Sequence, residues 1–330
     1  MTTTLALGAA INAGLRTAME NDPHVVVMGE DVGTLGGVFR VTNGLKNAFG
    51  AARVIDTPLT EAGIVGTAIG MAMRGYRPVC EMQFDGFVYP AFDQIVSQLA
   101  KMHARSNGRI TLPIVIRIPV GGGIGAVEHH SESNEAYFAH TAGLRVVACS
   151  NPNDAFHMIQ QAIACQDPVV FYEPKRRYWD RGEVADTTPL RLGDAAVLRD
   201  GTDCVLLAHG PSVAVALAAS DAAAEDGASV GVVDLRSLSP LDDETIRAAV
   251  RRARRAVVVH EASTFLGIGA ELAARITESC FFELDAPVLR VGAYNMPYPA
   301  AHVENAFLPD VDRVLDAVDR SLHYEELRAS

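Results

Sequence analysis

Three polar features of the sequence have residue types that suit acid–base chemistry, and each stands among apolar residues. Glu61 begins a glycine-rich helical stretch, Gln83 closes a strand-like run near Phe87, and His129 and His130 follow a glycine-rich loop. Carboxylates and imidazoles are the side chains that most often move protons in enzymes. These residues are therefore the first candidates for a functional site.

Glu61 has two explanations when it is taken alone. A strand-like run ends at Asp56, and Thr60 can cap the helix that follows. An acidic residue in the first turn of a helix is favourable in itself, and this is the simpler explanation for a lone glutamate. The alternative is a buried carboxylate that bonds a ligand.

The helix that Glu61 begins has three glycines on one face. Gly63, Gly66 and Gly70 are spaced by three and four residues. Each glycine in a helix interior costs about 0.5–1 kcal/mol relative to alanine. The pattern therefore predicts that a second backbone packs closely against this face.

The other candidates also have simpler explanations. Phe87 on its own is as well explained as a core residue. Adjacent histidines point in different directions on any regular backbone, so at most one of His129 and His130 enters a pocket. Either is explained by a surface position, although a histidine beside a glycine loop also fits proton transfer.

The first half of the chain alternates helical and strand patterns. Short, nearly continuous apolar strands between helices indicate a parallel sheet that is covered on both faces. Helices are predicted over 4–21, 60–70, 90–105 and 153–165, and strands over 25–28, 53–56, 77–83, 112–118, 144–148 and 168–172.

The periodicity fails over residues 175–193 and then resumes on a smaller scale. Helices are expected near 211–225, 241–254, 268–279 and 311–323, with strands over 204–208, 231–235, 256–260 and 288–291. We therefore predict an α/β protein with two parallel-sheet domains, residues 1–182 and 183–330. A chain of 330 residues suits two domains, because single cores rarely grow beyond about 250–300 residues.

Composition excludes several classes of protein. The net charge of −12 argues against nucleic-acid binding, which needs a basic surface. The five cysteines are scattered without a CxxC pair, which predicts free thiols in a reducing compartment. The sequence has neither a secretion signal nor an apolar run long enough to span a membrane, so we expect a cytoplasmic protein.

Common catalytic motifs are absent from the sequence. It contains no Walker A motif, no HExxH and no G-x-S-x-G. The glycine run over residues 121–125 departs from G-x-G-x-x-G and precedes no clear helix, so a flexible turn explains it better than a dinucleotide site.

Motifs along nearly the whole chain resemble the β subunit of thiamine-diphosphate-dependent 2-oxoacid dehydrogenases, the E1 components. The match is carried, in chain order, by Gly29-Glu-Asp-Val-Gly33, Gly37-Val-Phe-Arg-Val-Thr42, Asp56-Thr-Pro-Leu-Thr-Glu61, Glu81-Met-Gln-Phe84, Pro90-Ala-Phe-Asp-Gln-Ile95, His130-Ser131, Glu173-Pro-Lys175, Val233-Asp-Leu-Arg-Ser-Leu238 and Val259-His-Glu261. Within the family, the segments 123–131 and 173–178 look most like the branched-chain (2-oxoisovalerate) type of bacteria.

The resemblance implies a pyrimidine-binding domain followed by a transketolase C-terminal-like domain. It assigns Glu61 to the glutamate that bonds N1′ of the aminopyrimidine, which lets the 4′-nitrogen remove the proton from C2. Phe87 matches the aromatic residue against the pyrimidine, and Gln83 and Leu59 match its neighbours. His130 matches the histidine that assists acyl transfer to the lipoyl group of E2.

The resemblance also implies partners. The family forms an α2β2 heterotetramer in which the α subunit holds the diphosphate through Mg²⁺ with a GDG…NN motif, and this chain contains no GDG. The expected activity is the decarboxylation of branched-chain 2-oxoacids such as 3-methyl-2-oxobutanoate, followed by acyl transfer to E2. Pyruvate or acetoin is the alternative substrate, and a nucleotide-binding α/β oxidoreductase or a non-catalytic assembly subunit is the alternative from another class.

Three departures from the family pattern stand out. Glu132 replaces a glutamine near the expected lipoyl entrance, and Tyr294-Asn-Met-Pro297 replaces a turn of the family. Some relatives bind structural K⁺ through carbonyls near residues 112–115 and 165–167, but the acidic side chain that they use is not matched at Cys165. A K⁺ site is left open, and no protein ligand for a metal is assigned.

Overall fold

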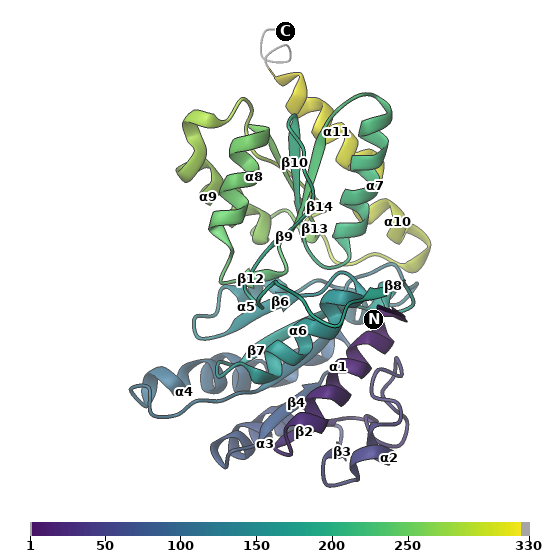
Figure 1. Ribbon diagram of the computed structural model, residues 1–330, viewed down its shortest axis with the longest axis vertical. Helices are drawn as coiled ribbons and strands as arrows, with labels where there is room; N and C mark the ends of the chain where they lie inside the picture. Colours follow the sequence, from purple (N-terminus) through teal and green to yellow (C-terminus); the bar gives the residue numbers. More distant parts are fainter. Residues whose placement is uncertain (1, 325–330) are drawn as a thin grey trace. The chain divides into compact units, whose positions relative to one another are not determined.

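The computed structural model describes residues 2–324 and divides them into two compact units (Figure 1). The first unit contains the chain up to residue 121 together with residues 129–192, and the second contains residues 122–128 and the chain from 193 onward. Each unit has a mostly parallel sheet with helices on it, which confirms the predicted α/β fold class.

The first unit follows the predicted alternation of strands and helices. Its strands are β1 (Thr3–Ala6), β2 (Val25–Gly29), β3 (Val54–Asp56), β4 (Arg77–Glu81), β5 (Val115–Val120), β6 (Arg145–Ala148), β7 (Val169–Pro174) and β8 (Arg181–Val184). Its helices are α1 (Leu7–Asn21), α2 (Leu45–Phe49), α3 (Glu61–Met73), α4 (Ala100–Arg105), α5 (Glu135–Ala139) and α6 (Pro152–Ala164).

A parallel sheet forms the centre of this unit. Its strands run in the order β6-β7-β5-β4-β2-β3, and every neighbouring pair is parallel. Val27, Val79, Val115 and Val169 lie opposite one another across four strands and are at most 1% exposed. Such a fully apolar strand pattern is what a sheet covered on both faces requires.

Helices α1 and α6 lie side by side over one face of the sheet (Figure 1). Their contact depends on Gly14, because a Cβ atom there would lie 2.5 Å from Ile159 and 2.7 Å from the carbonyl oxygen of Phe156. Helix α6 is capped by Asn151, whose side chain accepts a hydrogen bond from the amide of Asp154 at 2.9 Å.

Two segments of the first unit differ from the helices that periodicity predicts. Residues 3–6 form β1, which pairs with β8, so the first helix starts only at Leu7. The helix predicted over 90–105 is a 3-10 turn (Asp85–Ala91), a π-helical turn (Gln94–Leu99) and α4 in succession. Pro90 has no amide hydrogen, which accounts for irregular bonding at the start of this segment.

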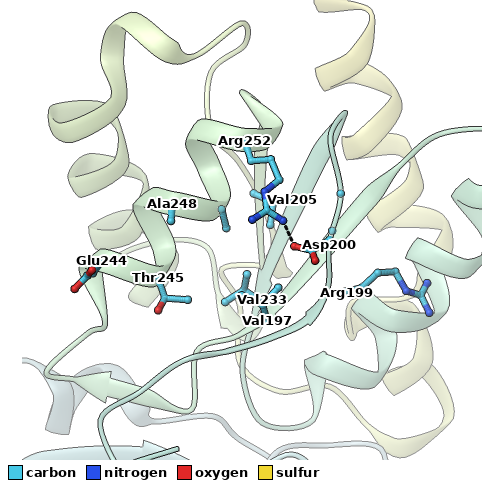
Figure 2. Close-up of a pocket in the computed structure, with 12 residues that line it drawn as sticks. Val197, Arg199, Asp200, Val205, Val233, Glu244, Thr245, Ala248 and Arg252 are labelled. Atoms are coloured by element: carbon cyan, nitrogen blue, oxygen red, sulfur yellow. Dashed lines mark hydrogen bonds and ion pairs between the residues drawn. The ribbon is translucent and has the colours of Figure 1, made fainter.

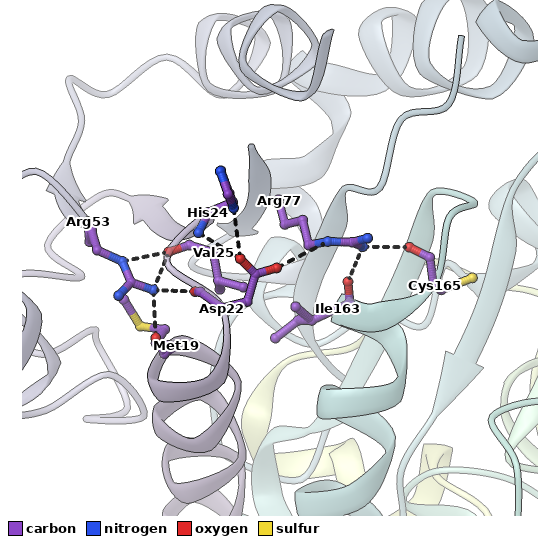
Figure 3. Close-up of polar contacts among 8 residues, drawn as sticks. All are labelled: Met19, Asp22, His24, Val25, Arg53, Arg77, Ile163 and Cys165. Atoms are coloured by element: carbon purple, nitrogen blue, oxygen red, sulfur yellow. Dashed lines mark hydrogen bonds and ion pairs between the residues drawn. The ribbon is translucent and has the colours of Figure 1, made fainter. Parts of the chain in front are cut away.

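Two arginines tie the amino-terminal edge of the sheet to the ends of helices (Figure 3). Arg53 donates to the carbonyl oxygens of Met19, Asp22 and Val25 at the end of α1 and the start of β2. Arg77 donates to the carbonyl oxygens of Ile163 and Cys165 at the end of α6. Cations at helix carboxyl termini satisfy the last carbonyl groups and favour the helix dipole.

The second unit has a smaller sheet with the order β14-β13-β10-β11-β9. Its strands are β9 (Ala196–Arg199), β10 (Cys204–Ala208), β11 (Val230–Asp234), β12 (Ser237–Ser239), β13 (Ala256–Ser263) and β14 (Leu289–Ala293). Its helices are α7 (Ser212–Glu225), α8 (Asp243–Ala253), α9 (Ile268–Cys280), α10 (Glu304–Phe307) and α11 (Val311–Leu322). Only β9, which the sequence pattern did not predict, pairs antiparallel within this sheet.

The cysteines are free thiols, as predicted from their spacing. Burial raises the pKa of Cys80 and Cys204 to about 12, so both stay protonated at neutral pH. In the part of the chain that the structure describes, no helix is both long and apolar enough to cross a membrane.

Candidate active site

The predicted site residues of the first unit gather at the carboxyl edge of its parallel sheet. Glu30 and Asp31 follow β2, Glu61 follows β3 at the start of α3, and Gln83 follows β4. These three strands are neighbours in the sheet. Ligands of open α/β sheets bind at this edge, because the loops there converge on one side.

Two carboxylates at this edge are buried near each other. Glu61 and Glu30 are each 8% exposed. The pKa of Glu30 is raised by burial first, and then by the negative charges of Glu61 and Asp31. Oxygen Oε1 of Glu30 is buried and has no hydrogen-bond partner among the described residues. The sequence analysis did not select Glu30, although its position directly after a buried strand is a signal that points to it.

Glu61 does more than begin a helix. Thr60 occupies the N-cap position of α3, but its side chain makes no capping hydrogen bond within the described structure, so the predicted cap is wrong in this respect. The Glu61 side chain is turned into the protein beside another carboxylate, a placement that the helix dipole alone does not explain. A buried pair of acids, one of which has an oxygen without a hydrogen-bond partner among the described residues, is an arrangement typical of functional sites.

Gln83 and Leu59 are placed at the same edge but in different surroundings. The amide of Gln83 donates to Asp31 at 3.3 Å, and Asp31 has a left-handed backbone conformation with φ of 59°. Such a conformation is uncommon for residues other than glycine and often marks functional loops. Leu59 is 81% exposed, which is unusual for a large apolar side chain.

His130 lies in an aromatic cluster with Phe84 and Phe87. Its ring centroid is 4.1 Å from that of Phe84 and 5.2 Å from that of Phe87. His130 is half-buried and His129 is exposed, but their ring centroids are only 4.4 Å apart and that of His129 lies 6.0 Å from that of Phe87. The prediction that the two histidines point in different directions is therefore wrong. The structure thus brings Phe87 and His130 together, and Phe84 is a further member that the sequence analysis did not select.

The glycine face of α3 is open in this chain. Gly63 and Gly70 are exposed, and an added Cβ at Gly70 would have no other atom of the described residues within 4 Å. At Gly66 the nearest atom to such a Cβ is Oε1 of Gln94, at 3.6 Å, which is an ordinary contact. Nothing in the described part of this chain therefore requires glycine at positions 66 and 70.

The glycine loop over residues 122–125 is held by acidic side chains of the second unit. The amide of Gly122 donates to Glu261 at 3.1 Å, and that of Gly125 donates to Glu304 at 3.0 Å. Tyr298 also donates to Glu304, at 2.8 Å. These amides already donate to carboxylates and would have to leave them to bind a phosphate, which disfavours the interpretation of the loop as a dinucleotide site. The same hydrogen bonds hold the loop in place.

A cavity of about 280 Å³ lies in the second unit between β9 and α8 (Figure 2). Its floor is formed by Val197, Val205 and Val233, and Arg252 pairs with Asp200 at its rim. None of the site residues predicted from the sequence lines it.

The K⁺ site left open by the sequence would use backbone carbonyls near residues 112–115 and 165–167. No group of three or more His, Cys, Asp or Glu side chains within residues 2–324 is arranged to hold a metal ion. The carbonyl of Cys165, one of the positions considered for K⁺, accepts a hydrogen bond from Arg77 at 3.3 Å (Figure 3). The guanidinium takes up one of the two lone pairs of this carbonyl oxygen, and the K⁺ site stays a prediction.

Family models match both units. The transketolase pyrimidine-binding domain matches residues 3–179, and the transketolase C-terminal domain matches residues 193–314. A solved split-gene transketolase, described as an inactive β4 tetramer, superposes with a TM-score of 0.79 over 96% of this chain and 98% of its own, at 22% identity. The chain therefore has the two α/β domains of the transketolase fold, as the resemblance implied.

Comparison with curated relatives shows which family of proteins with these two domains the chain belongs to. The chain is 58% identical to the pyruvate dehydrogenase E1 component subunit beta of Leifsonia xyli, over 97% of this chain and 95% of that protein. It is 52% identical to the 3-methyl-2-oxobutanoate dehydrogenase subunit beta of Mycobacterium tuberculosis, over 98% and 93%. It is 45% identical to the pyruvate dehydrogenase E1 component subunit beta of Bacillus subtilis, over 96% and 98%. The chain belongs to the β subunits of 2-oxoacid dehydrogenase E1 components.

The raised pKa of Glu30 gives a stability prediction. A carboxyl whose pKa is raised in the folded state stabilises below the unfolded pKa and loses that contribution as pH rises through the folded pKa. Glu30→Gln should therefore raise the melting temperature of the isolated chain at pH 8, and the gain should shrink as the pH approaches 4.5, the ordinary pKa of this side chain.

Thermal unfolding followed by circular dichroism across this pH range measures the effect. Glu20→Gln, at an exposed position of α1, is the matched control and should show no comparable pH-dependent gain. A gain for Glu30→Gln that is equal at pH 8 and near pH 5 would show that charge burial is not its cause.

Proposed function

We propose that this chain is the E1 β subunit that supplies the pyrimidine-facing half of a thiamine diphosphate site and acts with an α subunit on branched-chain 2-oxoacids. The observation that supports it best is the buried pair of Glu61 and Glu30 at the carboxyl edge of the first sheet. The assembly is an α2β2 heterotetramer, with the α subunit holding the diphosphate through Mg²⁺. The acyl product passes to the lipoyl group of E2.

The residues at this edge fit the pyrimidine half of the cofactor. Glu30 has a buried oxygen without a partner among the described residues, and Glu61 lies beside it. Two buried carboxylates are stabilised by a ligand that donates hydrogen bonds to them, as a protonated aminopyrimidine does. When bound, thiamine diphosphate supplies the carbon nucleophile and the electron sink for decarboxylation.

Each side chain has a distinct part in this proposal. Glu61 holds a proton at N1′ of the aminopyrimidine and so acts as the acid–base group of this chain. Phe87 packs against the pyrimidine, and Gln83 and Leu59 complete its surroundings. His130 takes up or gives a proton when the acyl group moves to the lipoyl sulfur.

The open surfaces of the first unit support a partner for the site. Leu59 is largely exposed, and so are Gly63 and Gly70 on the glycine face of α3, among the described residues. Leu59 and this face lie next to the proposed cofactor residues in the sequence, so a partner seated there also closes the site. The α subunit is the partner that we propose.

Branched-chain 2-oxoacids are proposed as substrates because the segments over 123–131 and 173–178 resemble that type, and one relative is a 3-methyl-2-oxobutanoate dehydrogenase subunit. Pyruvate is the second candidate, favoured by the higher identity to the Leifsonia xyli subunit. The nucleotide-binding oxidoreductase alternative is not retained, because the chain belongs to the E1 β family.

Kinetics of the tetramer separate the two substrates. With its own α subunit, the enzyme should show a higher kcat/KM for 3-methyl-2-oxobutanoate than for pyruvate, measured with ferricyanide as the electron acceptor. Activity on pyruvate far above that on 3-methyl-2-oxobutanoate would refute the branched-chain proposal and leave the E1 assignment in place.

Glu61→Ala tests the catalytic role. In the reconstituted tetramer, this variant should lower the rate of decarboxylation by about 10²–10⁴-fold, the usual contribution of a general acid–base group. Glu20→Ala, on the exposed surface of α1, should leave the rate unchanged. If Glu61→Ala decarboxylates at the wild-type rate, this chain is an assembly subunit instead.

Gly66→Leu tests the packing of α3. The variant should fold, because Gly66 meets only an ordinary contact within the chain, but it should fail to assemble with the α subunit. Gly193→Leu, at a position with no other described atom within 4 Å of an added Cβ, is the control that should assemble normally. A stable tetramer of Gly66→Leu on a sizing column would contradict close packing at this face.

A further inference from the structure

Asp85 and Lys175 form an ion pair that solvent does not reach. Both side chains are 0% exposed, and the ammonium of Lys175 donates to Oδ1 of Asp85. Asp85 begins the 3-10 turn after β4, and Lys175 directly follows β7. Buried ion pairs add little to stability, since desolvation offsets their attraction, and their best-attested use is to fix one arrangement among several.

The second oxygen of Asp85 holds the chain just after His130. Oδ2 accepts a hydrogen bond from the amide of Glu132 at 2.9 Å. The backbone carbonyl of Asp85 accepts another from Asn134 at 3.0 Å, and Asn134 in turn accepts one from Tyr172 at 2.8 Å. These bonds join the turn after β4 to the segment 132–134.

The residues on both sides of Asp85 hold His130 itself. Phe84 and Phe87 pack against the imidazole, as described above. At Gly86, an added Cβ would lie 2.4 Å from the carbonyl oxygen of His129, so any side chain there must displace this backbone. Residues 84–87 therefore form a cradle for the segment 129–132, and we call them the histidine cradle.

The ammonium group of Lys175 supports two residues of the histidine cradle, Phe84 and Asp85. Its ammonium lies 5.7 Å from the ring centroid of Phe84, the aromatic residue nearest to His130. Without Lys175, the carboxylate of Asp85 would be buried and unpaired, a state that costs more than the pair itself contributes. The carboxylate of Glu132 has another partner, Tyr89, whose hydroxyl donates to it at 3.3 Å. It is thus the backbone of Glu132, and not its charge, that fixes the loop.

We propose that Asp85 and Lys175 are positioning residues for His130 and that they act on acyl transfer to the lipoyl group more than on decarboxylation. This inference rests on the proposed function, which gives His130 its part in acyl transfer. The rate of a proton-transfer step depends steeply on placement, and an error of about 1 Å can cost about 10²-fold. Decarboxylation relies on Glu61, which contacts neither member of the pair in any described bond.

The two half-reactions can be measured separately in the α2β2 tetramer. Reduction of ferricyanide reports decarboxylation, and acylation of the lipoyl domain of the organism's own E2 reports transfer. Asp85→Asn, Lys175→Met and Gly86→Ala should each lower transfer by about 10- to 100-fold more than they lower decarboxylation. Gly86→Ala disturbs the histidine cradle without removing a charge.

A readout without turnover accompanies these rates. Amide hydrogen exchange of the segment 129–134 in the tetramer should become faster in all three variants, because bonds or space that fix this backbone are lost. Asp154→Asn and Gly193→Ala are the matched controls. Asp154 is a buried carboxylate of α6 that accepts a hydrogen bond from Asn151 at 2.9 Å, and Gly193 has open space around it. Neither control should change the ratio of the two rates.

His130→Ala separates failure of this inference from failure of the proposed function. If His130→Ala lowers transfer but the three cradle variants leave the ratio of transfer to decarboxylation as in the controls, the positioning role is wrong, whatever their hydrogen exchange. If His130→Ala itself leaves transfer unchanged, the assigned role of His130 is wrong and the inference falls with it. A wild-type tetramer without turnover of any 2-oxoacid would refute the proposed function.

Discussion

Arg117, on β5, joins the carboxyl ends of the two strands beside it, β4 and β7, and the site depends on this junction. From β5 it donates to Glu81 at the end of β4 and, with two nitrogens, to Glu173 near the end of β7, at 2.6–2.8 Å. Tyr178 adds a hydrogen bond to Glu173 at 2.7 Å. A guanidinium that is 0% exposed is tolerated only with such complete pairing. This pairing holds the strand ends together, and it therefore positions the residues that directly follow them.

Two parts of the candidate site directly follow the residues that Arg117 pairs with. Gln83 and the histidine cradle follow Glu81 by a few residues, and Lys175 follows Glu173 by two. One strand further along the sheet, β2 presents Glu30, and β3 leads to Glu61. The charges of Arg117, Glu81 and Glu173 are thus paired with one another, whereas Glu30 at the neighbouring edge has an oxygen without a partner among the described residues. The carboxylate that lacks a partner therefore lies at the edge where we propose that a ligand and a second subunit bind.

The sequence predicted the fold class, most strands and most helices, because apolar runs and helical periodicity are local signals. It did not predict β1, β8 or the antiparallel β9, which are short and only partly buried, so their pairing depends on distant strands. Glu61, Gln83, Phe87 and His130 were selected from local motifs and a family resemblance. Glu30, Phe84 and the Asp85–Lys175 pair were not, since their significance arises from residues up to 90 positions away along the chain.

In the proposed function, Glu61 is the cofactor-facing carboxylate of a site shared with another subunit. A crystal structure of the α2β2 tetramer with thiamine diphosphate and Mg²⁺ tests it most directly. We expect a Glu61 carboxylate oxygen within about 3.2 Å of N1′ of the aminopyrimidine, a normal hydrogen-bond distance. An aminopyrimidine bound away from Glu61, with this carboxylate paired to a side chain of the α subunit, would contradict it.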